Sequence, residues 1–225
     1  MDTPSPEVEL AAGGTEQAKA GPARQFSTGK LTAKQARTVN AWRRELLRRR
    51  PRRYATEDAR APASSSDCLA VIVVELLMSR PAPVDVARYA VAVRLAHQDA
   101  QPRRFPGASH VTFYLPAPIA DAAEKELLVE ARAAHLAAVE EVLRDAASKY
   151  PGRNQAGARA EHIHHELQAR GLTRTVPKAL PVGTLARMAI DRWTDRPAEA
   201  VVAAAVVHAA RFHEPRRARS DMGTQ

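Results

Sequence analysis

Hydrophobic residues recur at intervals of three and four along most of this chain, the spacing that places them on one face of an α-helix. Prolines and glycines interrupt the pattern and divide it into segments. These segments predict helices over residues 31–50, 67–78, 84–97, 119–149, 156–170, 182–196 and 198–212. The chain is therefore expected to be mainly α, a helical domain with one long helix at 119–149.

Residues 110–115 break this pattern and alternate between apolar and polar side chains. They are rich in β-branched and aromatic residues and precede Pro116, which predicts one short strand. The alternation predicts Val111, Phe113 and Leu115 on an inward face and His110, Thr112 and Tyr114 on an outward face. A lone strand leaves its backbone groups unpaired, and no second strand is evident, so we expect pairing across a homodimer.

The same pattern divides the chain into four regions. Residues 1–29 contain scattered prolines and glycines without periodic apolar residues, which predicts a disordered tail. Residues 30–100 are expected to form a basic N-terminal helical region, and residues 105–213 a helical domain that contains the strand. Residues 214–225 are expected to form a second disordered tail, which is basic.

The overall composition favours a polyanionic partner. Hydrophobic residues make up 45% of the chain but aromatic residues only 4%, which suits a core of close-packed helices. The formal net charge is +9 and the isoelectric point is about 10.3. A basic excess of this size favours DNA, RNA or an anionic membrane surface as the partner.

Most of the positive charge lies in one segment. Residues 30–60 contain eleven Lys and Arg against three Asp and Glu, a local balance of +8. Clustered cations release several condensed counterions at one place, and arginine contacts phosphate through two hydrogen bonds. The residues expected to contact the DNA backbone are Arg43, Arg44, Arg48, Arg49, Arg50, Arg52 and Arg53. The alternative is a solvated basic helix end that interacts favourably with the helix dipole.

The strand and the start of the following helix, residues 110–135, resemble the opening of ribbon-helix-helix DNA-binding proteins. In that family two chains pair one strand each, and the ribbon enters the major groove of DNA. The resemblance implies that His110, Thr112 and Tyr114 read base edges. The chain departs from the family pattern because its first helix is much longer and because the nearest second helix, 182–196, requires an insertion. The alternative is a short strand packed within a helical domain.

The helices predicted at 156–170 and 182–196 are a second candidate for reading DNA. They resemble a helix-turn-helix motif loosely, because the connection between them is longer than usual. In that arrangement Lys178, Thr184, Arg187 and Arg192 would contact DNA. A plain helical hairpin is the alternative.

Several patterns argue against a metal site and against an enzyme. His162, His164 and His165 share one predicted helix, but the signature His-Glu-x-x-His is absent, so surface histidines are expected and no metal is predicted. The single cysteine, Cys68, lies in an apolar run and is expected to be a buried thiol. The sequence contains no glycine-rich phosphate loop and no nucleophile motif. We therefore predict no enzyme activity, no cofactor and no small-molecule substrate.

Together these patterns predict a DNA-binding protein, such as a transcriptional regulator or a plasmid or replicon maintenance factor. The expected partners are DNA and a second copy of the chain, with no membrane. The start of the chain lacks the pattern of a secretory signal, so a cytoplasmic protein is expected, nucleoid-associated if it binds DNA. The alternative is an assembly module that uses the acidic face of the long helix and binds no nucleic acid.

Overall fold

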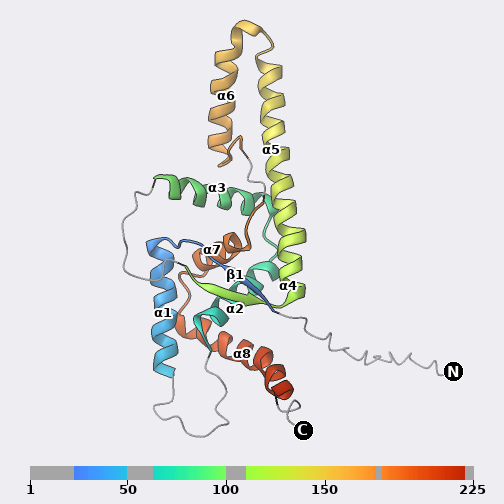
Figure 1. Cartoon of the computed structure of the whole chain (residues 1–225). Coiled ribbons are helices and arrows are strands. Elements are labelled where there is room, and N and C mark those ends of the chain that lie inside the picture. The colour runs from blue at the N-terminus through green and yellow to red at the C-terminus, as the bar shows by residue number, and fades with distance from the viewer. Residues whose placement is uncertain (1–22, 50–62, 100–109, 176–178, 221–225) are drawn as a thin grey trace, which may run out of the picture.

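The computed structural model describes residues 23–49, 63–99, 110–175 and 179–220, with side chains up to residue 96 in the second range and residue 209 in the last. Within these ranges the chain is mainly helical, as predicted (Figure 1). The helices are α1 (Ala33–Arg49), α2 (Ser65–Met78), α3 (Pro83–Asp99), α4 (Ala117–Asp121), α5 (Leu128–Lys149), α6 (Ala156–Ala169), α7 (Val182–Arg192) and α8 (Ala198–Ser220). A π-helical segment, Ala122–Leu127, joins α4 to α5. The predicted long helix is therefore confirmed as one helical stretch that ends at Lys149.

Local hydrogen bonds define the start of α1 and the end of α6, the two helix ends that the sequence marks most clearly. Before α1, the backbone amide of Thr32 donates to the side-chain oxygen of Gln35 at 3.0 Å, and the amide of Gln35 donates to the Thr32 hydroxyl at 3.2 Å. After α6, Gly171 adopts a φ of 65°, and the amide of Leu172 donates to the carbonyl of Leu167 at 2.8 Å. Glycine is favoured in this left-handed position because it lacks a Cβ atom.

The last two helices differ in length from the prediction. Helix α7 ends at Arg192 rather than at residue 196. Helix α8 begins at Ala198 as expected but continues to Ser220, so residues 214–220 are helical and the prediction of a disordered tail is wrong for them. A basic composition is a weak indicator of disorder because arginine is a good helix former.

Strand β1 (Arg24–Ser27) pairs with strand β2 (Thr112–Leu115) in a two-stranded antiparallel ribbon. Its register sets Phe26 opposite Phe113 and Gln25 opposite Tyr114. The partner strand belongs to the same chain, so the expectation that β2 finds no partner within the chain is wrong, and its pairing does not require a second copy. The predicted tail at 1–29 is also wrong over residues 24–27. The strand gives little signal in the sequence because it has four residues, of which three are exposed.

A single buried core underlies the ribbon. Its members include Trp42 of α1, Leu69 and Ile72 of α2, Phe113 of β2 and Leu185 of α7, none more than 1% exposed. These side chains come from both of the regions into which the sequence pattern divides residues 30–213. The ribbon and the helices of both regions therefore rest on one shared core.

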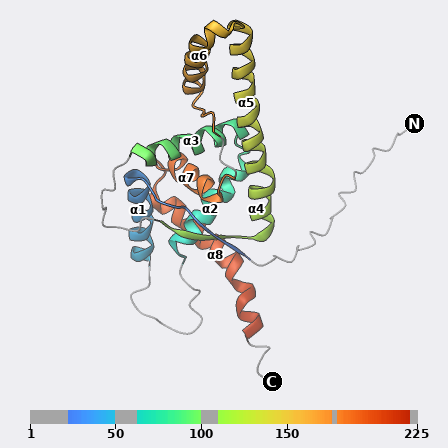
Figure 2. The ribbon, with the colours of Figure 1, turned by 45° about the horizontal axis from the view of Figure 1, so that its top comes forward.

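Helices α5 and α6 form a hairpin that projects from this core in two different views (Figures 1 and 2). Helix α5 packs against α3 near the core and against α6 beyond it. The hairpin has a small core of its own, made of Val139, Val142, Leu167 and Leu172. We call residues 138–172 the arm and the other described residues the body.

Candidate nucleic-acid interface

One face of the ribbon carries polar side chains and is open to solvent. Gln25 lies opposite Tyr114 and Ser27 lies opposite Thr112, and residues opposite each other share a face. Tyr114 is 47% exposed, Gln25 and Ser27 are exposed, and Thr112 is partly exposed. His110 is exposed as well. The outward orientation predicted along β2 is therefore confirmed, and β1 adds two polar residues that the sequence analysis missed because it assigned them to a tail.

The opposite face anchors the ribbon on the core. Phe113 and Leu115 are 0% exposed and Val111 is 5% exposed. Phe26 packs against Phe113 with ring centroids 5.9 Å apart. Past the end of β1, the amide of Thr28 donates to the carbonyl of Val111, and the amide of Val111 donates to the Thr28 hydroxyl, each at 3.0 Å. This anchoring fixes which residues point outward, because a slip of one residue would reverse the two faces.

The start of α7 lies directly against the end of β1. Gly183, the second residue of α7, approaches the backbone of Ser27 and Thr28 so closely that a Cβ atom would overlap the carbonyl oxygen of Ser27. Glycine is required here because of this close approach rather than because of its φ angle. Helix α7 therefore sets the position of the ribbon through direct backbone contact.

The positive charge of Arg24, at the first residue of β1, is neutralised by carboxylates of the same chain. The guanidinium of Arg24 lies 3.1 Å from the carboxylate of Asp121 and 2.6 Å from that of Glu124. The same guanidinium lies 5.5 Å from the ring centroid of Phe26. Arg24 therefore ties β1 to the start of the long helix, and its charge contributes little to attracting an anion.

Helix α1 presents a row of cations to solvent. Lys34, Arg37, Arg44 and Arg48 are exposed, and their spacing places them on one side of the helix. The row extends over about 21 Å, at roughly 1.5 Å per residue. The buried side of the helix carries Trp42, which is 1% exposed. We call these four cations the α1 basic row; it offers several positive charges along one direction, as a phosphate backbone would require.

The arginines predicted to bind the DNA backbone have different surroundings. Arg43 is half-buried, whereas Arg48 is exposed and lies 3.6 Å from Glu45. Arg49 forms an ion pair with Glu45 at 2.8 Å and donates to the carbonyl of Glu199 at 3.2 Å, so it connects α1 to α8. Arg44 is exposed, and Arg50, Arg52 and Arg53 lie outside the described residues. Within the described part of the chain, the α1 basic row thus adds Lys34 and Arg37, near the start of α1, to the predicted arginines.

Two of the predicted contacts from α7 to DNA, Thr184 and Arg187, are wrong, whereas Arg192 is exposed and donates to the Ser79 hydroxyl at 2.9 Å. Thr184 is 2% exposed and Arg187 is 9% exposed, so neither side chain is available at the surface. Lys178 lies outside the described residues. The helical pattern of α7 did not reveal this because the helix is buried on most of its circumference.

A polar network around Asp191 joins α1, α3 and α7. The Tyr89 hydroxyl donates to the carboxylate of Asp191 at 2.5 Å, and the side-chain amide of Gln35 donates to the same carboxylate at 2.8 Å. Burial raises the pKa of Tyr89, and its hydrogen bond to Asp191 raises it further. Burial also lowers the pKa of Arg187. The network holds α7 in place beneath the ribbon, which is a structural role.

Other chemically reactive side chains are dispersed. His162 Nε2 lies 2.9 Å from a carboxylate oxygen of Asp145, a contact within the arm. Cys68 is buried as predicted, and burial raises the pKa of its thiol to about 12. Among the described residues, no three His, Cys, Asp or Glu side chains are grouped so that they could hold a metal ion. Over the same residues, no helix combines the length and the apolar character needed to cross a membrane.

Comparisons with known proteins do not identify a relative. No family model matches the sequence, and no curated protein and no solved structure is significantly similar to it. Function must therefore be inferred from the residues themselves. The two features that stand out are the polar outward face of the ribbon and the α1 basic row.

Proposed function

We propose that this protein binds DNA, with the outward face of the ribbon in the major groove and the α1 basic row on backbone phosphates. The observation that carries the proposal is the ribbon: Phe113 anchors it on the core, while Gln25, Thr112 and Tyr114 face away from the core. The major groove of B-form DNA is wide enough for a two-stranded ribbon. The proposed role is that of a non-enzymatic regulator of transcription or replicon maintenance.

The outward side chains have the chemistry that base edges require. The amide of Gln25 can donate and accept together, which matches the edge of adenine. The hydroxyls of Ser27 and Thr112 can each donate or accept, and they lie side by side in the ribbon. The phenol of Tyr114 lies opposite Gln25 and combines an apolar ring with a polar tip. Such a set favours base reading over mere attachment to phosphate.

The proposed likeness to ribbon-helix-helix proteins lies in the ribbon itself, because the pairing of both strands within one chain departs from the two-chain assembly of that family. In that family each of two chains gives one strand. Here β1 and β2 of one chain form the ribbon, and each strand leads into a helix, α1 or α4. In this interpretation α7 is the second helix after β2, and the arm is the insertion that separates it from the first. A single chain would then supply the ribbon that two chains build elsewhere.

The alternative, assembly through the acidic long helix, has less support from the contacts of that helix. Asp121 and Glu124 bind Arg24 of β1. Glu141 lies 3.1 Å from Arg170 of the arm. Several acids at the start and near the end of the helix therefore have partners within the chain and stabilise its own fold.

A salt titration tests the proposed phosphate contacts. Changing Lys34, Arg37, Arg44 and Arg48 together to Gln removes four positive charges from the α1 basic row. The matched control changes Arg132, Arg144, Lys149 and Arg153 of the long helix and the arm, all exposed or partly exposed, to Gln. We expect the first variant to reduce the slope of log affinity against log salt by about 3 to 4, because each lost phosphate contact contributes about 0.9. The control should change the slope much less, and equal slopes in both variants, measured by fluorescence anisotropy, would refute these contacts.

Selection of bound duplexes from a random pool tests the ribbon. The wild-type chain should enrich a defined short motif. The double variant Gln25→Ala with Tyr114→Ala should lose that enrichment while it still binds the pool, because base contacts specify and phosphate contacts position. A control variant, Asn154→Ala in the arm, should enrich the wild-type motif. Enrichment of that motif by the ribbon variant would exclude base reading by the ribbon.

A further inference from the structure

A pocket of about 850 Å³ lies where the arm meets the body. One wall comes from α3, the opposite wall from α6 and the residues just after it, and Met188 of α7 also lines the pocket. Pockets that hold small molecules commonly have volumes of roughly 300 to 1,000 Å³. The size therefore fits a molecule of a few tens of atoms rather than a polymer.

The pocket is lined mainly by apolar side chains. Val91 and Leu95 contribute from α3, and Ile163, Leu167 and Leu172 contribute from the arm. Leu95 is 45% exposed, so a large part of this apolar side chain is open to water. An apolar molecule in the pocket would remove this surface from water, and that burial is favourable.

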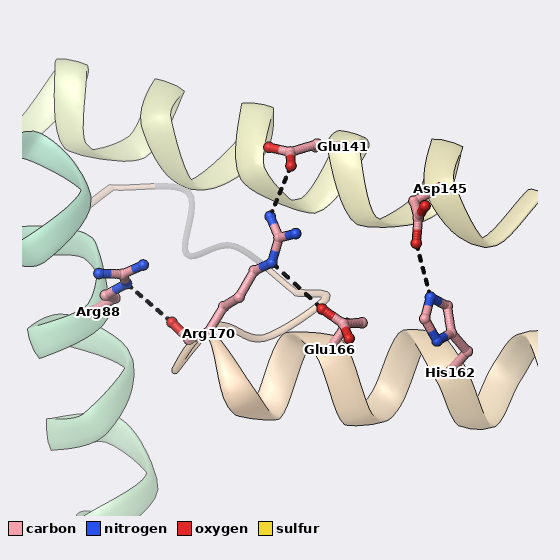
Figure 3. Close-up of polar contacts among 6 residues, drawn as sticks. All are labelled: Arg88, Glu141, Asp145, His162, Glu166 and Arg170. Atoms are coloured by element: carbon pink, nitrogen blue, oxygen red, sulfur yellow. Dashed lines mark hydrogen bonds and ion pairs between the residues drawn. The ribbon is translucent and has the colours of Figure 1, made fainter.

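The charged groups around the pocket are mostly positive. Arg88 and Arg174 line it together with His164, against one acid, Asp85. The guanidinium of Arg88 lies 3.4 Å from Asp85, so the acid is partly neutralised, and Arg88 Nε donates to the carbonyl of Arg170 at 3.0 Å (Figure 3). Among the described residues, Arg174 forms no ion pair. The pocket thus has one cation in excess at its rim.

We propose that this pocket binds a small apolar molecule that carries an anionic group, such as a medium-chain carboxylate or an aromatic acid. The apolar walls receive the body of the molecule, and Arg174 binds its anionic group. A cationic molecule of the same size would meet repulsion from both arginines. This site is separate from the ribbon and from the α1 basic row, and its test requires no DNA.

The test uses the full chain and the fluorescent probe anilinonaphthalene sulfonate, which is apolar and anionic. The probe should bind saturably, and its fluorescence should rise because the apolar walls shield the bound probe from water. Ala92→Trp places an indole in the pocket, whereas the matched control Ala133→Trp places one on the exposed side of α5. We expect Ala92→Trp to weaken probe binding by about tenfold or more and the control to bind as the wild type does. Binding at wild-type affinity by the Ala92→Trp variant overturns the proposal.

A second pair of variants tests the charge and does not depend on filling the pocket. Leu95→Glu adds a negative charge at the pocket wall, and Leu136→Glu adds one at a similarly exposed leucine of α5. The first should weaken probe binding, and the second should not. Decanoate should displace the probe, and decyltrimethylammonium should displace it poorly. Equal displacement by both, or no effect of Leu95→Glu, overturns the anionic assignment, and circular dichroism melts confirm that each variant folds.

Discussion

The body and the arm are both built from alanine-rich and leucine-rich helices, but they bury their side chains to very different degrees. The body encloses Trp42, Phe113 and other large side chains with almost no exposure. The arm has four buried residues in its own cluster, and it stands away from the body in both views (Figures 1 and 2). The body therefore provides most of the folding stability and fixes the ribbon, whereas the arm can loosen while the ribbon stays in place.

Polar contacts at the surface supplement the small core of the arm. The guanidinium of Arg170 lies 3.1 Å from Glu141 and 3.8 Å from Glu166, and His162 lies 2.9 Å from Asp145 (Figure 3). Exposed ion pairs contribute little to stability because water and salt screen them. They do, however, fix the register of α6 along α5. The surface ion pairs thus align α6 with α5, whereas the small apolar core of the arm contributes only modestly to its stability.

The largest difference between the two regions should be seen with the same substitution in each core. Leu76 of α2 is 0% exposed in the body and Leu167 of α6 is 5% exposed in the arm. Leu76→Ala should lower the free energy of global unfolding by about 4 kcal/mol, and Leu167→Ala by at most about 2 kcal/mol, because the arm can relax around the cavity. Urea denaturation measures both values.

Hydrogen exchange then shows where each of these two variants loosens. Leu167→Ala should speed amide exchange in α6 and in the far part of α5 while the ribbon stays protected. Leu76→Ala should speed exchange across the body and the ribbon together. Equal destabilisation by the two variants, with loss of ribbon protection in both, would show that the arm and the body unfold as one unit.

A smaller effect, but one of opposite sign in the two regions, is expected from glycine substitutions. Gly183→Ala forces a Cβ atom against the carbonyl of Ser27, which cannot move without shifting β1, so it should destabilise the body by about 1 to 3 kcal/mol. Gly157 lies in α6 of the arm, and the space that a Cβ atom would occupy there is open. Gly157→Ala should therefore stabilise the arm by about 0.5 kcal/mol, because alanine favours the helix. Thermal unfolding followed by circular dichroism should show opposite shifts of the midpoint.

The two regions also differ in how well the sequence predicted them. The arm was predicted almost completely, because its helices are long and end at clear signals such as Gly171. In the body, alternation in β2 correctly predicted the inward side of Phe113 and the outward side of Tyr114. The partner strand was missed because its four residues lie more than eighty positions earlier, beside prolines and glycines. Pairing between distant segments depends on the tertiary fold, which local patterns do not contain.

The buried polar residues of the body were misinterpreted for a related reason. Thr184 and Arg187 were expected to face outward because polar side chains usually do. Arg187 donates to the carbonyl of Lys30 at 3.4 Å, and the carboxylate of Asp191 and the hydroxyl of Tyr89 lie near enough to act on its charge. A polar residue can be buried where other polar groups satisfy it, and for Arg187 these groups come from α3, from α7 and from the segment before α1. Only the assembled structure brings them together.

The smallest expected effect lies in the arm and concerns a single proton. The hydrogen bond from His162 lowers the pKa of Asp145 below its ordinary value of 3.8, with smaller contributions from Lys149 and Arg170. The pKa of Asp145 is lower in the folded protein than in the unfolded chain. The ionised carboxylate therefore stabilises the fold at pH values above the pKa of the unfolded chain, and this stabilisation is lost as the pH falls through the pKa of the folded protein. His162→Ala should therefore raise the pKa of Asp145 toward 3.8, whereas His165→Ala, at an exposed position of the same helix, should leave it unchanged. Carbon-13 NMR of the Asp145 carboxyl measures the shift, and a pKa that stays low in His162→Ala would assign it to Lys149 and Arg170 instead.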